Sequence, residues 1–213
     1  MPTDIRSTYL EAARSAVELV QQPVVAQRWQ QPSALTGFTV GGLAAHLASQ
    51  LFLAANVLAV AEPAEEPIPL LEHYARVRWI GSSLDSEANV SIRQAGEDAA
   101  GPGAAALADR AQATLTELRT TIPDQPSGRV VFISWGPWAL TLDTFLTTRT
   151  MEIAVHSDDL AVSVDLPTPP LPVEATDTVL QLLTQLAVRR HGPTAVMRAL
   201  SRAERAPESV AAF

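Results

Sequence analysis

The stretch LTLDTFLTTRTMEIAVHSDDLAVSV, residues 140–164, has the apolar content of a long helix that lies largely inside a protein. Arg149, Glu152, His156 and Asp159 are spaced by three, four and three residues, so all four project from one helical face. Such a polar stripe is either solvated, with an i,i+4 carboxylate and imidazole pair, or it lines a polar site within a helical bundle. The stretch on its own leaves both interpretations open.

Segments on both sides carry the same helical periodicity, and prolines and glycines divide them. The predicted helices span residues 5–20, 40–61, 70–99 with an interruption near 81–83, 104–121, 174–190 and 193–205. Residues 129–135 are β-branched and aromatic, which predicts a short strand or extended link. We therefore expect a mainly α fold, with a helical bundle over residues 1–165 and a small C-terminal helical extension over 166–213 packed on it.

His46 lies on the predicted helix 40–61, which otherwise contains mostly alanine, leucine, phenylalanine and valine. A lone histidine on an apolar helix is more often a hydrogen-bonded core residue than a ligand. Together with Glu152 and His156, however, it makes two imidazoles and one carboxylate. That is the ligand set of a catalytic zinc site, in which three protein ligands leave one coordination position open.

The other polar residues have two interpretations each. Asp159 either accepts the far imidazole proton of His156 or is a solvated helix residue. Arg149 either pairs with Glu152 or faces an anionic substrate, and the pair with Glu152 is slightly favoured. His73 and His191 are expected on surface and C-terminal helices and not as ligands. The four tryptophans are expected in the core rather than stacked on a ligand: Trp29, Trp79, Trp135 and Trp138.

The chain of 213 residues contains no lysine and no cysteine, and all 15 of its basic residues are arginine. These absences exclude a disulfide, a Cys-ligated metal, a thiol nucleophile and a lysine Schiff base. The net charge of -8 argues against nucleic acid or an anionic membrane as the main partner. The N-terminus lacks the apolar centre of a signal peptide, and the most apolar run, residues 51–61, is too short to span a bilayer. We therefore expect a cytoplasmic protein.

Two segments resemble the signatures of a known family. Residues 29–47, WQQPSALTGFTVGGLAAHL, are similar to its first pattern of Trp, Pro-Ser, Gly-Trp-Thr-Val and Leu-x-x-His. Residues 149–161, RTMEIAVHSDDLA, are similar to its second pattern, Arg-x-x-Glu-x-x-x-His-x-x-Asp-Leu. The family is that of the mycothiol-dependent maleylpyruvate isomerases, which are DinB-like metalloproteins with an up-down four-helix bundle. Phe38 stands where the family usually has tryptophan, and the chain is shorter than the full isomerases, which carry a larger C-terminal domain.

The resemblance implies that His46, Glu152 and His156 are metal ligands. It also implies an enzyme in which zinc, or another divalent metal, lowers the pKa of an external thiol, mycothiol, so that a thiolate exists at neutral pH. That thiolate would serve either cis–trans isomerisation of a maleylpyruvate-like acid or S-transfer to an electrophile. The alternatives are a metal-dependent hydrolase that uses bound water and a non-catalytic helical binding protein. The expected partners are a small substrate and a small thiol, and a homodimer is possible.

Overall fold

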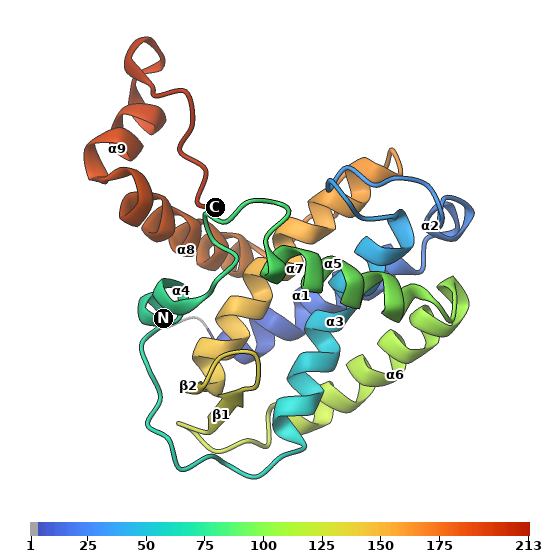
Figure 1. Cartoon of the computed structure of the whole chain (residues 1–213). Coiled ribbons are helices and arrows are strands. Elements are labelled where there is room, and N and C mark those ends of the chain that lie inside the picture. Colours follow the sequence, from blue (N-terminus) through green and yellow to red (C-terminus); the bar gives the residue numbers. More distant parts are fainter. Residues whose placement is uncertain (1–3) are drawn as a thin grey trace.

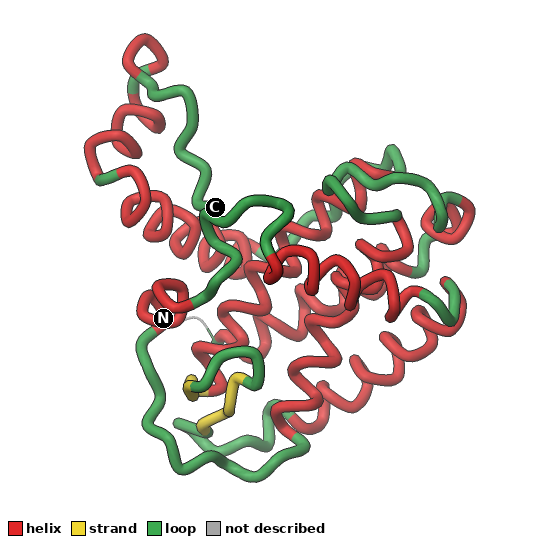
Figure 2. The backbone as a smooth tube through the Cα atoms, in the orientation of Figure 1, coloured by secondary structure: helices red, strands yellow, loops and turns green. Residues whose placement is uncertain are grey.

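The computed structural model describes residues 4–213 and is mainly helical, with two short strands among the described residues (Figures 1 and 2). Four long helices form the central bundle: α1 (Ile5–Val20), α3 (Val40–Leu58), α6 (Ala104–Thr121) and α7 (Leu142–Ser163). This confirms the predicted mainly α fold. Residues 1–3, at the start of the predicted bundle domain, lie outside the described residues.

The bundle interior is aliphatic and aromatic. Each buried leucine or phenylalanine contributes about 1.5–3 kcal/mol relative to an exposed one. The largest fully buried side chains come from all four helices and include Tyr9, Leu43, Leu47, Leu51, Leu115, Leu118, Phe145 and Leu146. Helix α6 shows the underlying pattern, because its buried leucines and alanine recur at helical spacing from Leu107 to Leu118.

Helix α3 is apolar on nearly every side. It begins after Thr39, whose side chain caps the helix by accepting a hydrogen bond from the Gly42 N–H. By length and composition it is the one helix in residues 4–213 that passes as a membrane span, with a mean hydropathy of 1.3 in its most apolar window. The bundle buries 72% of that window, so the apolar surface of α3 is accounted for by core packing.

A crossing helix anchors the start of α3. The predicted helix 70–99 is divided more widely than expected, into α4 (Leu70–Arg76) and α5 (Glu87–Ala100) with a loop between them. On α5, Gly96 lies so close to α3 that an added Cβ would come within 2.9 Å of the Gly42 carbonyl oxygen. The next residue, Glu97, accepts a hydrogen bond of 2.8 Å from the Thr39 N–H. Helix α5 thus holds the first turn of the helix that carries His46.

The extended segment is a β-hairpin rather than a single link. Strand β1 (Val130–Ile133) pairs with β2 (Trp138–Thr141) in antiparallel register, with Val130 opposite Thr141. The helix predicted to begin at about residue 140 is present but begins at Leu142, because β2 occupies residues 138–141. The Thr141 side chain accepts from the Thr144 N–H and so caps α7. Gly136 permits the tight turn, since a Cβ there would collide with the Trp138 ring.

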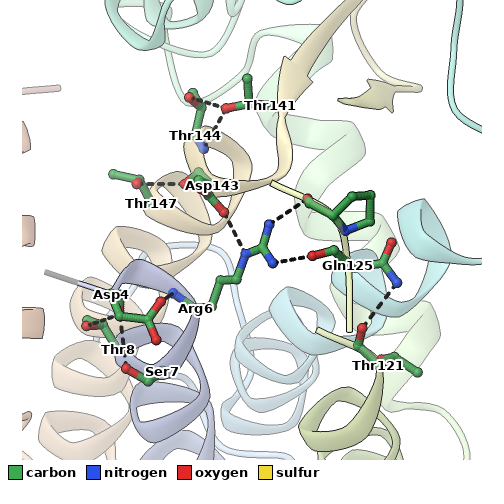
Figure 3. A network of polar contacts seen from close by, with 11 residues as sticks. Asp4, Arg6, Ser7, Thr8, Thr121, Gln125, Thr141, Asp143, Thr144 and Thr147 are labelled. Atoms are coloured by element: carbon green, nitrogen blue, oxygen red, sulfur yellow. Dashed lines mark hydrogen bonds and ion pairs between the residues drawn. The ribbon is translucent and has the colours of Figure 1, made fainter. Parts of the chain in front are cut away.

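One arginine ties three elements together below this hairpin. Arg6 of α1 forms an ion pair with Asp143 in the first turn of α7, with Nε and Oδ1 2.9 Å apart (Figure 3). Its two terminal nitrogens donate to the carbonyl oxygens of Gln125, at 2.6 Å, and Pro126, at 3.0 Å. The guanidinium therefore fixes the α6–β1 connection against α1 and α7.

The C-terminal part projects from the bundle in Figure 1 and contains α8 (Val173–His191), α9 (Pro193–Ser201) and a 3-10 turn, η1 (Ala203–Arg205). A second apolar cluster joins α8 to α4 and α7: Tyr74, Met151, Val179, Leu182 and Leu186. A short helix, α2 (Pro23–Gln27), follows α1 in the stretch between the predicted helices 5–20 and 40–61. Proline is well suited to the first turn of a helix, where its missing N–H is not needed. The division into domains at residue 165 stays a prediction.

Candidate metal centre

Three potential metal ligands from two helices converge where α3 meets α7. His46 comes from α3, and Glu152 and His156 come from successive turns of α7. One potential ligand atom from each side chain lies within 4.8 Å of the others. The two imidazole rings are edge to face, with their centroids 4.6 Å apart. We refer to His46, Glu152 and His156 as the triad.

Hydrogen bonds orient His156 within the triad. Its Nε2 lies 3.1 Å from Oε2 of Glu152, and its Nδ1 lies 3.0 Å from Oδ2 of Asp159. Asp159 therefore fixes the plane of the ring and leaves Nε2 directed at Glu152. A carboxylate on the far nitrogen of a ligating histidine is the usual way in which proteins set its tautomer.

Burial and neighbouring charges act in opposite directions on these groups. For His46, burial and the nearby His156 lower the pKa of the imidazole to about 4. Burial also lowers the pKa of His156, but hydrogen bonds to Asp159 and Glu152 outweigh it and raise that pKa to about 9. Burial would raise the pKa of Glu152, but the hydrogen bond from His156 and the charge of Arg149 bring it down to about 2. Without metal, the centre is an imidazolium between two carboxylates beside a neutral imidazole.

The donor set of the triad fits a divalent metal. Two imidazole nitrogens and one carboxylate oxygen form the three-ligand pattern of catalytic zinc sites, and other divalent ions accept the same donors. The side chains of Glu152 and His156 each keep 14% of their surface exposed, so a small molecule could approach an ion from solvent. The phenyl ring of Phe38 lies beside His46, with ring centroids 5.6 Å apart. An apolar ring at this position shields one side of the centre and adds no ligand.

Arg149 does not form the expected pair with Glu152. Among the described residues its Nη1 donates to Oε1 of Gln50, at 2.6 Å, and its Nε donates to Oγ1 of Thr148, at 3.0 Å. The guanidinium also lies 5.3 Å from the ring centroid of Phe145 and 5.6 Å from that of Trp135. The expectation of an Arg149–Glu152 pair is wrong because the side chain reaches across to α3 instead of along its own helix.

The structure also corrects the predicted burial of two aromatic residues, His73 and Trp135. His73 is buried rather than on the surface, and its Nδ1 accepts a hydrogen bond of 3.0 Å from the Trp138 indole N–H. Burial and the charge of Arg149 lower the pKa of His73 to about 4, so it is neutral. Trp135, expected in the core, is 47% exposed at the turn of the hairpin. Nothing in the sequence connects residue 73 with residue 138, since the contact depends on how α4 packs against β2.

Comparison with known proteins agrees with this architecture. The family model of the mycothiol maleylpyruvate isomerase N-terminal domain matches residues 10–161. The chain belongs to this family. No curated protein matches the chain.

Two solved structures are similar to the chain. One is the crystal structure of the mycothiol-dependent maleylpyruvate isomerase, with a TM-score of 0.54 and 16% identity. The other is a histidine-to-alanine mutant described under the same name, with a TM-score of 0.54 and 14% identity. In both cases the match covers 85% of this chain and 69% of the other. At this level of identity the likeness shows that the fold is shared.

The sequence drew attention to most of the polar residues at this centre but did not assign Gln50 a role. Gln50 is 1% exposed and lies one turn after His46 on the same helix. A buried amide on an otherwise apolar helix was a usable signal, because buried polar side chains need partners. Its partner, Arg149, became evident only when α3 and α7 were packed together.

Proposed function

We propose that the chain is a divalent-metal-dependent enzyme that activates a low-molecular-weight thiol, mycothiol. The observation that carries the proposal is the convergence of His46, Glu152 and His156 within 4.8 Å in a member of a mycothiol isomerase domain family. The proposed metal is zinc or another divalent ion that accepts the same donors. The proposal places the protein in the cytoplasm, with a small electrophile and a small thiol as its partners.

The three triad residues would hold the metal. When bound, a divalent ion supplies a Lewis acid that lowers the pKa of a thiol from about 8.5, so that the sulfur is nucleophilic at neutral pH. Asp159 keeps the His156 ring in place and retains the proton on Nδ1. The lone pair of Nε2 is then available to bind the metal. Because the chain has no cysteine, the sulfur must come from a separate molecule.

Two reactions could follow from a metal-activated thiol. In isomerisation, the sulfur forms a C–S bond to one carbon of a conjugated double bond and the electron pair moves to the adjacent carbonyl. Rotation about the resulting single bond and expulsion of the sulfur then restore the double bond and the thiol. In S-transfer, the C–S bond persists, and either a leaving group departs with its electron pair or the carbanion takes up a proton. The proposal includes both outcomes, each acting on a maleylpyruvate-like acid or a comparable electrophile.

Metal analysis and spectroscopy test the proposal. The chain purified without added metal is expected to contain about one divalent ion, and the cobalt-substituted form is expected to gain thiolate-to-metal absorption when mycothiol is added. His191→Ala provides a matched control, since that histidine donates to a backbone carbonyl outside the triad. No bound metal, or no melting-temperature shift on chelation, would favour the binding protein. Turnover of electrophiles that is indifferent to thiol would favour the hydrolase.

A further inference from the structure

The charge of Arg149 is largely buried and has no carboxylate partner in residues 4–213. The residue is 7% exposed. The groups that contact its guanidinium are a neutral amide, a neutral hydroxyl and two aromatic rings. Its Nη2 makes no hydrogen bond to any described residue. An arginine remains charged at any physiological pH, so a permanent positive charge lies here that acts on Glu152 through space but has no carboxylate in direct contact.

Three partly buried arginines elsewhere in the described residues are neutralised. Arg6 pairs with Asp143, Arg28 with Asp165 at 2.7 Å, and Arg129 with Glu62 at 3.5 Å. Removing a charge from water without a counterion is costly, and proteins ordinarily offset the cost with a paired group. Arg149 is more deeply buried than these three and than Arg93, which also lacks a carboxylate partner, and this depth of burial supports a ligand as its counterion.

The position of Arg149 relates it to the triad. On α7 it precedes Glu152 by three residues, and on α3 its partner Gln50 follows His46 by four. Both spacings are one helical turn along the same face, so the Arg149–Gln50 contact lies about 5 Å along the α3/α7 seam from the triad. A small organic acid is long enough to span a separation of this size.

We propose that Arg149 binds a carboxylate of the electrophilic substrate and that Gln50 positions it for this role. Gln50 Oε1 accepts from Nη1, and its Nε2 donates to the His46 carbonyl oxygen at 2.9 Å, so the amide is locked from both ends. This arrangement leaves the Nη2 edge of the guanidinium for a planar carboxylate, which arginine binds through parallel N–H donors. Trp135, beside the guanidinium and exposed, forms the rim of this subsite. The inference rests on the proposed function and assigns Arg149 as the group that binds the carboxylate of its acid substrate.

Anion binding to the metal-free chain tests this inference without any turnover. Removing the metal eliminates direct ligation of the probe by an ion, so titration calorimetry with maleate reports the protein groups alone. Arg149→Gln is expected to weaken maleate binding at least about tenfold, since a charge-assisted contact is lost. Arg28→Gln, which removes an equal charge from an ion pair elsewhere, is expected to leave maleate affinity unchanged.

Gln50→Glu separates a binding role from a structural one. The new carboxylate would pair with Arg149, so the contact between α3 and α7 persists while the guanidinium is neutralised internally. We expect maleate affinity to fall at least about tenfold in this variant as well. If both variants bind maleate as the wild type does, Arg149 is only a structural tie and the inference is overturned.

The carboxylate that Arg149 binds could belong to the electrophilic substrate or to the thiol. To distinguish them, the zinc-loaded chain is titrated with two thiols, N-acetylcysteine and its amide, of which only the first has a carboxylate. Equal affinity for both is expected, because the sulfur and not a carboxylate would anchor the thiol. A preference for N-acetylcysteine that Arg149→Gln abolishes would assign the subsite to the thiol and overturn the inference. Failure of the chain to bind any divalent ion would refute the proposed function and leave the maleate result standing.

Discussion

Arg6 and Arg149 both connect α7 to another helix of the bundle, but their surroundings differ in kind. Arg6 reaches from α1 to the Asp143 carboxylate and two backbone carbonyl oxygens (Figure 3). Arg149 reaches from α7 to an amide and a hydroxyl, between two aromatic rings. The first guanidinium is neutralised and satisfied within the fold. The second is held in position but remains charged, one turn from the triad.

The difference shows how the two seams divide their roles. A guanidinium matched by a carboxylate and carbonyl oxygens contributes to stability, because a buried charge-assisted hydrogen bond yields about 1.5–3 kcal/mol and one to a half-exposed partner such as Asp143 yields less. A buried guanidinium with neutral partners contributes little and can even reduce stability. We therefore associate the α1/α7 seam with the integrity of the fold and the α3/α7 seam with ligand binding.

The largest effect is expected at the triad. His46→Ala removes one of three ligands, and metal affinity is expected to fall by more than about 100-fold, above the loss typical of an outer-sphere change. Arg6→Met should bind metal like the wild type, since it acts on the other seam. Equilibrium dialysis against a metal buffer measures both. A His46→Ala chain that retains one ion per chain with unchanged affinity would contradict the ligand assignment.

Asp159→Asn should give the next largest effect. The amide is nearly isosteric but carries no charge to hold Nδ1–H of His156, so metal affinity is expected to fall about 10–100-fold. The neighbouring carboxylate Asp158, which bonds Thr168 instead of the triad, provides the control as Asp158→Asn. Equal affinities in the two variants would show that Asp159 does not orient the ligand.

Arg6→Met is expected to affect stability rather than metal binding. It removes an ion pair and two charge-assisted bonds, and the free energy of unfolding is expected to fall by about 2 kcal/mol, or roughly 4–8 °C in Tm. Arg149→Met should change the free energy of unfolding less, because the charge it removes is unpaired. Urea denaturation of the metal-free variants measures both. The opposite ranking would place the structural tie at Arg149.

The smallest expected effect is the release of protons when the metal binds. Metal binding requires a free lone pair on Nε2 of His156, whose pKa is raised to about 9, so that ring is protonated at pH 7.5. His46 and Glu152, with pKa values of about 4 and 2, are already deprotonated. Binding should therefore release about one proton at pH 7.5 and none well above pH 9, and affinity should weaken as pH falls below 9. Calorimetry in buffers of different ionisation enthalpy measures the release, and a value of zero at pH 7.5 would contradict this charge state.

Local patterns account for what sequence reasoning predicted well. The helices 5–20 and 104–121 are found with the predicted bounds, because apolar periodicity and the flanking proline and glycine act within one segment. The hairpin was half predicted, since Val130–Ile133 has an obvious β composition, whereas Trp138–Thr141 merges into the apolar start of α7. The pairing of β2 with β1 separates residues 138–141 from α7. No property of residues 138–141 alone shows that they form a strand.

The sequence by itself determined that Arg149, Glu152, His156 and Asp159 share one face of α7, because helical geometry is a property of a single segment. It also excluded a cysteine nucleophile, so that any thiol must come from another molecule. Only the tertiary structure decided that His46 meets Glu152 and His156, and that Arg149 turns to Gln50 instead of Glu152. Such choices depend on how α3 and α7 pack, because side chains select partners by distance in space and not by separation along the chain.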